Sequence, residues 1–562
     1  MVKSLIRHSL ACAAALAVLF FIGAAKPVFA SAAVASAHPL ATRAGIEVLE
    51  MGGNAFDAAI AVSAALAVVE PSGSGLGGGG FWLLHDANSG QQVMLDGREK
   101  APLAADRDMY LDADGNVIDK ASVDGPLSAG IPGAPAALVW LAANKGVLPL
   151  SSSLARAIRY AEEGFITGEH YKRLMTFRKP VMEQFADSRQ IFMPGGDVPE
   201  PGSRIVQTDL ANTLRQIAQH GHDGFYGGQV AEKLVAGVRA AGGIWSMEDM
   251  TSYEVKLRAP IVSEYRGMQI TSAAPPSSGG LVMATAFNIL SAYDLDSMSS
   301  SEQIHLVSEA LRRAYRDRAE YMGDSDFVDI PFDMLTSPRY ADGLRQSIRL
   351  DRATSSDSLA PTRDEVPGGE DTTHFSVIDQ SGNRVAATLS INYPFGSGFV
   401  APGTGVLLND EMDDFSAKPG EPNVYGLVGA EANSIQPGKR MLSSMSPTFL
   451  ETDDRLAIVG TPGGSRIITM VFLAALAFHD DASAEQMVNL PRYHHQYLPD
   501  RIQHEPGAIS TDDMERLRAK GHTLHDRGRT WGNMHAIVVD KNSALVTAAS
   551  DARGEGKAIV LP

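Results

Sequence analysis

An irregular stretch that ends abruptly at a strand is the feature that most constrains how this chain can fold. From 354 to 371 the sequence TSSDSLAPTRDEVPGGED has no apolar periodicity and is rich in Ser, Asp, Pro and Gly, which is typical of an exposed, flexible loop. The strand pattern THFSVID follows, and QSGN and RVAATLSIN complete a hairpin signal. Thr372 and Thr373 therefore stand where a flexible segment becomes a strand.

The two threonines admit two interpretations. Threonine favours β-strands, and the dipeptide by itself indicates no more than that. A threonine hydroxyl becomes a good nucleophile when a base stands beside it, and one such base is the residue's own α-amine, freed by a cut immediately before it. A cut between Asp371 and Thr372 would place a new amino terminus at the edge of a sheet. The junction alone leaves both interpretations open.

The first 30 residues predict a secretory signal peptide. Lys3 and Arg7 provide a positive start, LACAAALAVLFFIG provides an apolar core, and VFA ends at Ala30 as a small-residue cleavage site. The core is short for a membrane span, and no second long apolar segment follows. We therefore expect an exported protein, periplasmic or secreted, with no membrane segment after the leader is removed.

Cysteine content and charge exclude several classes of protein. Cys12 is the only cysteine and leaves with the leader, so the mature chain has no disulfide, no thiolate nucleophile and no Cys-ligated metal. The formal net charge of −18 argues against nucleic acid as a partner. A chain of 562 residues that is 44% hydrophobic can hold itself by core burial alone.

Helices and strands are predicted along the remaining chain. A helix is expected over 41–51, and Asn54 is the expected N-cap of a second helix, AFDAAIAVSAALAVVE, which is apolar nearly all round and hence buried. Strands are expected from Phe81, in QQVMLDGRE before Arg98, and in GVLLND, RLAIVG, MHAIVVD and ALVTAAS. Further helices are expected in LARAIRYAEEG, LANTLRQIAQHG, QVAEKLVAGVRAAGG, SEQIHLVSEALRRAYRDRAEYMG and SRIITMVFLAALAFHD. Strands at both ends with helices between them predict packed layers.

Common cofactor and metal motifs do not fit this chain. GSGLGG from Gly73 matches G-x-G-x-x-G, but it follows a helix and precedes a strand, the reverse of the order in a dinucleotide fold. These glycines more simply allow close backbone packing or a tight turn. His494 and His495 in HHQ would point to opposite faces of a strand, which favours structural roles over metal binding. We expect neither a metal nor an organic cofactor.

Eight motifs along the mature chain resemble the γ-glutamyltransferase (γ-glutamyltranspeptidase) family of N-terminal-nucleophile hydrolases. They are GGNAFDAAIA, GREKAP, DTTHFSVID, NDEMDDFS, KPGEPNVYGLVG, KRMLSSMSPT, TPGGSRI and PRYHHQ, and they come in the family's order. The resemblance implies a four-layer αββα sandwich of the α+β class. It also implies a precursor that cuts itself into a large subunit, 31–371, and a small subunit, 372–562, which together form one fold as a heterodimer.

The resemblance implies which residues perform the chemistry. Thr372 is the expected nucleophile, exposed by a cut after Asp371, and its α-amine is the expected general base. Gly463 and Gly464 are the expected oxyanion hole, because backbone N–H groups can approach without side chains. Ser390 stands where the family often has Thr; its hydroxyl is expected to contact the nucleophile and assist the cut. Serine lacks the methyl group that restricts χ1, so maturation could be slower.

The same resemblance assigns the amino-acid end of the substrate to charged and hydroxyl side chains. A guanidinium and hydroxyls suit a carboxylate, and carboxylates suit an ammonium. Tyr425, in the lid segment KPGEPNVYGLVG, is expected to cover the pocket. The α-carboxylate is assigned to Arg98, Ser443 and Ser444, and the α-amino group to Asn392, Glu411 and Asp414.

The implied activity is removal of the γ-glutamyl group from glutathione or a related compound. A γ-glutamyl-enzyme ester would pass the group to water, an amino acid or a dipeptide, and a closed lid favours such small acceptors. One alternative is a cephalosporin or glutaryl acylase on the same scaffold, but a glutaryl chain has no ammonium to pair with Glu411 and Asp414. Another is an inactive binding homologue, against which Thr372, Arg98 and the Gly463–Gly464 pair argue.

Overall fold

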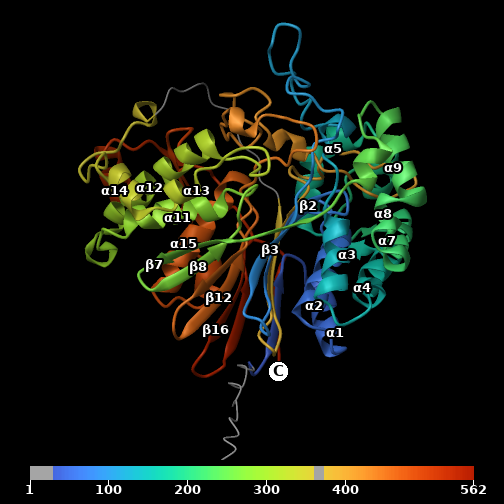
Figure 1. The fold of residues 1–562 in the computed structure, drawn as a ribbon, viewed down its shortest axis with the longest axis horizontal. Coiled ribbons are helices and arrows are strands. Elements are labelled where there is room, and N and C mark those ends of the chain that lie inside the picture. Colours follow the sequence, from blue (N-terminus) through green and yellow to red (C-terminus); the bar gives the residue numbers. More distant parts are fainter. Residues whose placement is uncertain (1–28, 360–371) are drawn as a thin grey trace, which may run out of the picture.

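Two antiparallel sheets lie face to face between layers of helices in a computed structural model, which describes residues 29–359 and 372–562 (Figure 1). The larger sheet has the strand order β18-β1-β9-β10-β2-β3-β6. Its strands are β18 (Lys557–Leu561), β1 (Ala32–Ser36), β9 (Thr373–Ile378), β10 (Arg384–Ser390), β2 (Gly79–His85), β3 (Gln92–Gly97) and β6 (Lys256–Arg258). The smaller sheet, in the order β17-β16-β12-β11-β8-β7, comprises Val546–Ser550, His535–Asp540, Arg455–Gly460, Thr448–Glu451, Met268–Ser272 and Ile261–Tyr265.

Helices cover the outer face of each sheet. Figure 1 shows α1 to α5 and α7 to α9 beside the larger sheet and α11 to α15 beside the smaller one. The first group is α1 (Pro39–Glu50), α2 (Ala55–Val69), α3 (Ala134–Asn144), α4 (Leu150–Glu163), α5 (Glu169–Met182), α6 (Ala186–Phe192), α7 (Thr208–His220), α8 (Asp223–Tyr226) and α9 (Gly228–Ala240). The second group is α11 (Gly279–Leu290), α12 (Ser300–Tyr321), α13 (Phe332–Leu335), α14 (Pro338–Arg345) and α15 (Ile467–His479). The predicted four-layer αββα sandwich is therefore confirmed.

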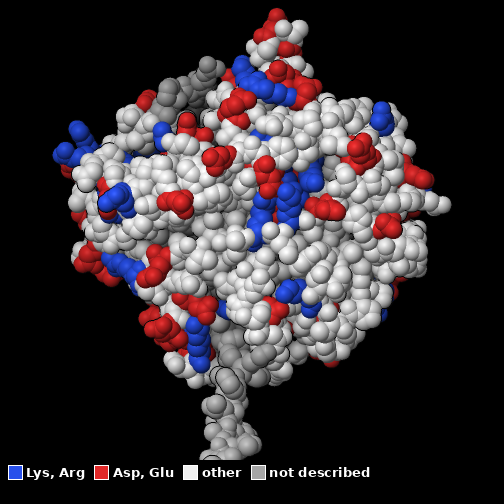
Figure 2. Space-filling model, viewed as in Figure 1, with Lys and Arg blue, Asp and Glu red and all other residues white. Residues whose placement is uncertain are grey.

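Short elements complete the described chain. These are α10 (Met247–Thr251), α16 (Ala484–Val488), α17 (Thr511–Ala519) and the strands Phe165–Ile166 (β4), Arg204–Ile205 (β5), Tyr493–His494 (β13), Ile502–His504 (β14) and Leu524–Asp526 (β15). No helix in 29–359 or 372–562 is long and apolar enough to cross a membrane. Only Phe29 and Ala30 of the predicted leader are described, so the leader stays a prediction. Figure 2 shows acidic and basic side chains interspersed on the face in view.

Strand alternation in β9 and β10 separates two environments. Ile378 and Ala386 pack between the sheets with Phe449 and Ile537. Phe375, Val377, Val385, Ala387 and Leu389 instead join the core shared with α2. Because successive side chains on a strand point to opposite faces, Thr372 and Ser390 share the face between the sheets, and Thr373 faces the helices.

Local signals explain the helix and the turn that precede the larger sheet. Asn54 caps α2 by accepting hydrogen bonds from the N–H groups of Phe56 at 2.9 Å and Asp57 at 3.0 Å, and Asp57 Oδ2 accepts from Asn54 N in return. Every residue of α2 is buried, as its apolar pattern predicts. After it, a Cβ on Gly77 or Gly78 would lie 2.0 Å from the Leu407 oxygen or 2.1 Å from the Ser390 oxygen. The glycine run therefore serves close backbone packing.

Two expectations about local structure are wrong. GVLLND forms no strand, because its N–H groups bond to separate segments: Leu408 N to Phe399 O, Asn409 N to Gly77 O and Asp410 N to Ile391 O. The stretch from 354 is not wholly exposed either. Ser356 is buried, and its hydroxyl donates to the Tyr497 carbonyl at 2.6 Å. Residues 360–371, including Asp371, lie outside the described residues.

Candidate active site

The predicted site residues gather around Thr372. A cavity of about 20 Å³ is lined by Arg98, Thr372, Ser390, Asn392, Asp414, Tyr425, Ser443, Ser444 and Gly464, together with Leu427, Met445 and Ile467. Gly463 and Thr372 also line a larger, adjoining cavity of about 170 Å³. Thr372 directly precedes β9, Ser390 ends β10 and Arg98 follows β3, so three strands of the larger sheet deliver these side chains. The smaller sheet contributes the segments before β11 and after β12.

Arg98 lies at the centre of a buried charge cluster. Its Nη1 donates to Glu411 Oε2 at 2.5 Å, and its Nη2 donates to Asp414 Oδ2 at 2.5 Å. Burial lowers the pKa of Arg98, but Glu411 and Asp414 outweigh that effect and raise it overall. Burial raises the pKa of Glu411 to about 7 against the opposing effect of Arg98. Arg98, which is expected to bind the substrate's α-carboxylate, is therefore paired with Glu411 and Asp414, which are expected to bind its α-amino group.

A third carboxyl group, that of Glu99, stands beside this cluster. Its Oε2 lies 3.7 Å from Arg98 Nη1, and the side chain is fully buried. Burial, and then the charge of Glu411, raise the pKa of Glu99 well above its usual range. Burial thus favours the neutral form of Glu99, which limits the negative charge around Arg98. Sequence reasoning missed Glu99, although it directly follows Arg98 in GREKAP.

The two serines are held by residues of the smaller sheet's helical layer. The Ser278 hydroxyl donates to the Ser443 carbonyl at 2.7 Å, and the Ser443 hydroxyl accepts from Met445 N at 3.1 Å. Arg318, on α12, donates to the Ser444 hydroxyl at 3.3 Å and to the Ser278 hydroxyl at 2.9 Å. Arg318 is a second residue that sequence reasoning missed, because its periodic helix gives no sign that this arginine turns inward.

Asn392 and Tyr425 join the rim of the small cavity. Asn392 has a positive φ of 71°, the left-handed conformation that Asn tolerates better than most residues, and its N–H donates to the Ser390 hydroxyl at 2.7 Å. The Tyr425 hydroxyl donates to the Asn392 carbonyl at 2.6 Å. A Cβ on Gly464 would lie 2.5 Å from Tyr425 Cδ1. The tyrosine ring thus packs directly over the glycine at the end of the cavity.

The Gly463–Gly464 pair requires glycine for its backbone. The φ angles are 141° and 55°, and side-chain-bearing residues rarely adopt the first of these. A Cβ on Gly463 would also lie 2.5 Å from Met470 Cε. The pair precedes α15, and each glycine lines a cavity that Thr372 also lines, an arrangement that can bring backbone N–H groups to a developing oxyanion.

The two histidines of the HHQ motif have structural partners, as predicted. His494 Nδ1 bonds to the Thr469 hydroxyl at 2.8 Å and its Nε2 bonds to Gln496 Oε1 at 2.7 Å. His495 Nε2 instead lies 3.3 Å from Asp500 Oδ1. Gln496 in turn donates to the Gly426 carbonyl at 3.1 Å, so this motif supports the lid segment from below.

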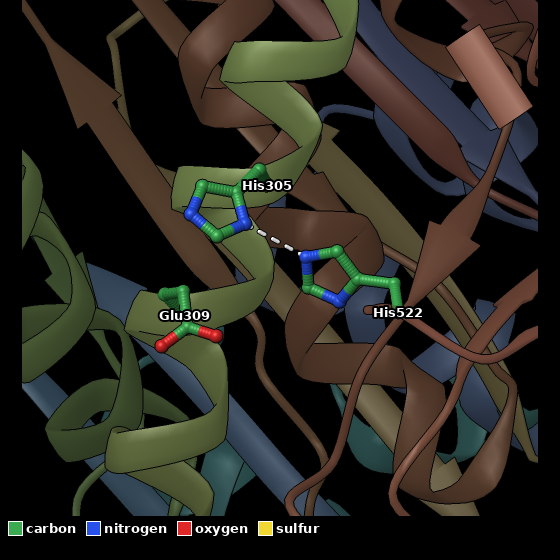
Figure 3. Close-up of side chains that lie close together, drawn as sticks. All are labelled: His305, Glu309 and His522. Atoms are coloured by element: carbon green, nitrogen blue, oxygen red, sulfur yellow. Dashed lines mark hydrogen bonds between the residues drawn. The ribbon is translucent and has the colours of Figure 1, made fainter. Parts of the chain in front are cut away.

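A buried group of two histidines and a glutamate lies away from this site. His305 and Glu309 come from α12, and His522 approaches them from the chain after α17 (Figure 3). His305 Nδ1 and His522 Nε2 bond at 2.7 Å, and His305 Nε2 donates to the Arg349 carbonyl at 2.8 Å. Glu309 pairs with Arg313 at 2.6 Å and accepts from the Thr354 hydroxyl at 2.5 Å. These contacts fasten the segment from 349 to 354 onto α12.

Comparisons with known proteins agree on one family. The model of the gamma-glutamyltranspeptidase family matches residues 41–561. The chain is 44% identical over 529 residues to a glutathione hydrolase proenzyme of Pseudomonas sp. (strain A14), with 92% of this chain and 90% of that protein covered. It is 41% identical over 525 residues to the glutathione hydrolase proenzyme of Escherichia coli (strain K12), with the same coverage. The crystal structure of a cephalosporin acylase from Bacillus halodurans superposes with a TM-score of 0.83 at 28% identity, over 94% of this chain and 95% of that one.

Proposed function

The chain belongs to the gamma-glutamyltranspeptidase family of N-terminal-nucleophile hydrolases, and we propose that it is a self-cleaving γ-glutamyltransferase and glutathione hydrolase. The observation that carries this proposal is the cavity in which Thr372 meets Arg98, Asp414 and the Ser443–Ser444 pair. A nucleophile beside a guanidinium, carboxylates and hydroxyls suits an acyl donor that ends in an amino-acid zwitterion.

Maturation begins with a cut between Asp371 and Thr372. The Thr372 hydroxyl attacks the carbonyl of residue 371, and the resulting ester is hydrolysed to leave a free α-amine on Thr372. The products are the large subunit, 31–371, and the small subunit, 372–562. They stay together because β9 and β10 of the small subunit pair with β1 and β2 of the large subunit inside one sheet. The proposed export of the protein rests on the predicted leader.

Catalysis uses the same hydroxyl a second time. The α-amine of Thr372 takes the hydroxyl proton as the oxygen attacks the γ-carbonyl of the donor. The backbone of Gly463 and Gly464 stabilises the tetrahedral oxyanion, and the leaving amine departs with a proton. Water, an amino acid or a dipeptide then attacks the γ-glutamyl ester and regenerates Thr372. Glutathione is the proposed donor.

Donor binding requires an exchange of charge partners. The α-carboxylate of the donor bonds to Arg98 and to the hydroxyls of Ser443 and Ser444, while its α-ammonium bonds to Glu411, Asp414 and Asn392. Arg98 already pairs with Glu411 and Asp414. When the zwitterion binds, its carboxylate replaces these two carboxylates as the partner of Arg98, and its ammonium replaces Arg98 as their partner. This exchange conserves the pairing of buried charges, which is costly to lose on either side.

An acylase is the second candidate, favoured by the likeness to the cephalosporin acylase. The two activities differ in the α-ammonium, which a glutaryl donor lacks. We would test the proposal by measuring anilide release from γ-glutamyl and glutaryl anilides, with and without glycylglycine. Release from the γ-glutamyl compound, accelerated by glycylglycine, is the expected result. Release from the glutaryl compound alone would identify an acylase, and a chain that stays as one band on a denaturing gel would exclude both.

A further inference from the structure

Glu70 bonds to the residue that follows the proposed nucleophile. It directly follows α2, and its Oε2 accepts a hydrogen bond from the Thr373 hydroxyl at 2.5 Å. Thr373 is the first residue of β9 and pairs with Leu389 on β10. Because Thr373 faces the helices and Thr372 faces the space between the sheets, a bond that fixes one residue also fixes the direction of the other.

The turn after Glu70 contacts Thr372 from the same side. Gly73 N and Ser74 N both donate to the Glu70 carbonyl, at 3.0 and 3.3 Å. A Cβ on Gly73 would lie 3.2 Å from the Thr372 carbonyl oxygen and 3.5 Å from Glu70 Cδ. Glu70 and Thr372 also line the cavity of about 170 Å³, together with Gly463. The carboxyl group, the turn and the nucleophile's own peptide therefore form one packed unit.

We propose that Glu70 is a positioning residue that acts through the Thr373 hydroxyl to aim the Thr372 hydroxyl, both for the cut and for turnover. The part of this inference that concerns turnover rests on the proposed function. A threonine nucleophile has one rotatable bond between its backbone and its oxygen, so the orientation of its peptide decides where that oxygen lies. Because Glu70 holds the Thr373 side chain on the side of the helical layer, the space between the sheets stays open for the donor.

The ionisation of Glu70 couples this contact to pH. Loss of hydration raises the pKa of Glu70 to about 8, against the bond from Thr373, and the charge of Glu555 adds to the rise. The other charged or titratable side chains that line the cavity are His38, His170, Tyr171, Arg173, Arg529 and Arg553. Burial lowers the pKa of both His38 and His170 to about 4, so neither carries charge at neutral pH. Arg553 pairs with Glu505 at 2.7 Å and with Asp551 at 3.1 Å.

A neutral Glu70 suits an amine that must act as a base. Below about pH 8 the protonated carboxyl accepts the Thr373 bond without adding negative charge to the cavity. Above that pH the carboxylate would stabilise the ammonium form of the Thr372 α-amine, since an opposite charge nearby favours the charged state. An ammonium group cannot take the hydroxyl proton, so the limb over which turnover rises with pH should lie at higher pH in the wild type than in a variant with no charge at residue 70.

Substitutions at both ends of the bond test the inference. Thr373→Val and Glu70→Leu each remove one partner, and each should slow self-cleavage and kcat by about 10- to 100-fold, because a small misplacement of a reacting group costs up to about that much in rate, with donor KM within about twofold. The double variant should be no slower than either single variant, because both act through one bond. Thr373→Ser and Glu70→Gln keep the bond and should stay near wild type at pH 7. Glu70→Gln should also shift the limb over which turnover rises with pH to lower pH than in the wild type.

Controls separate positioning from folding and from the proposed activity. Thr388→Val removes another buried hydroxyl bond, the one to His374 at 2.9 Å, and should lower the melting temperature without changing kcat. Wild-type rates in Thr373→Val, additive losses in the double variant, or a Glu70→Gln pH profile that coincides with wild type would each overturn the inference. If Glu70→Leu does not fold, the Thr373 and Glu70→Gln variants still decide. Wild type that cleaves itself but releases no anilide would contradict the proposed function, while cleavage rates would still test Glu70.

Discussion

Arg98 Nη2 donates a hydrogen bond to Asp414 Oδ2 at 2.5 Å, although the two residues are assigned to opposite ends of the substrate. Each therefore neutralises the other's charge in this site, and under the proposed function a zwitterionic donor would replace both partners. An acyl donor with a carboxylate but no ammonium would bond to Arg98 and leave Asp414 without its cation. We therefore propose Asp414 as the residue that separates a transferase from an acylase.

Asp414→Asn keeps the shape of the side chain and removes its charge. We expect a loss of roughly 3–5 kcal/mol of binding to a γ-glutamyl donor, or about two to three decades in kcat/KM. Glutaryl anilide, which has no ammonium, should lose far less. Both anilides are measured side by side on the variant, which should still cut itself. Equal losses on both would show that Asp414 supports the fold or the nucleophile.

Thr372→Ala removes the attacking hydroxyl and should abolish both the cut and the turnover. Thr372→Ser keeps the hydroxyl and should retain part of each activity, as Ser can serve as the same kind of nucleophile. Bands on a denaturing gel and the amino-terminal sequence of the smaller band check both expectations. A Thr372→Ala chain that still yields a fragment starting at residue 372 would mean that the cut is not intramolecular.

The lid around Tyr425 should control the size of the acceptor. Deletion of 422–427 removes the ring over Gly464 and its bond to the Asn392 carbonyl, so bulkier acceptors should be used without loss of maturation. Tyr425→Phe is the matched control, since it removes the hydroxyl bond but keeps the cover. Acceptor preference is measured by product analysis with dipeptides and longer peptides. A deletion variant that matures with unchanged preference would remove the lid from the mechanism.

The acid side of the pH profile should depend on Glu411. Burial raises the pKa of Glu411 to about 7, so the carboxylate that we propose as a partner of the donor's ammonium forms as the pH rises through that value. We expect kcat/KM on the γ-glutamyl anilide to fall as the pH drops below about 7. Glu411→Gln should lower kcat/KM at pH 8 and flatten this limb. An unchanged acid limb in the variant would assign that ionisation to another group.

Local signals predicted the parts of the fold whose hydrogen bonds close within a few residues. The Asn54 cap and the hairpin from Thr373 to Ser390 fall in this group, because their partners lie nearby in the chain. GVLLND failed for the opposite reason. Its apolar run is compatible with a strand, but its N–H groups bond to three separate segments, at Phe399, Gly77 and Ile391, and no local pattern reveals that division.

The sequence by itself determined the family, the layered fold and most of the polar residues around Thr372, because long motifs preserve the chemistry of a site in order along the chain. Tertiary structure alone decided how those residues are paired and ionised. Arg98 and Asp414 are 316 positions apart, and Thr373 and Glu70 are 303 apart. A pKa near 7 for Glu411 or 8 for Glu70 arises only when packing removes water from the carboxyl group, and that depends on neighbours that no stretch of sequence contains.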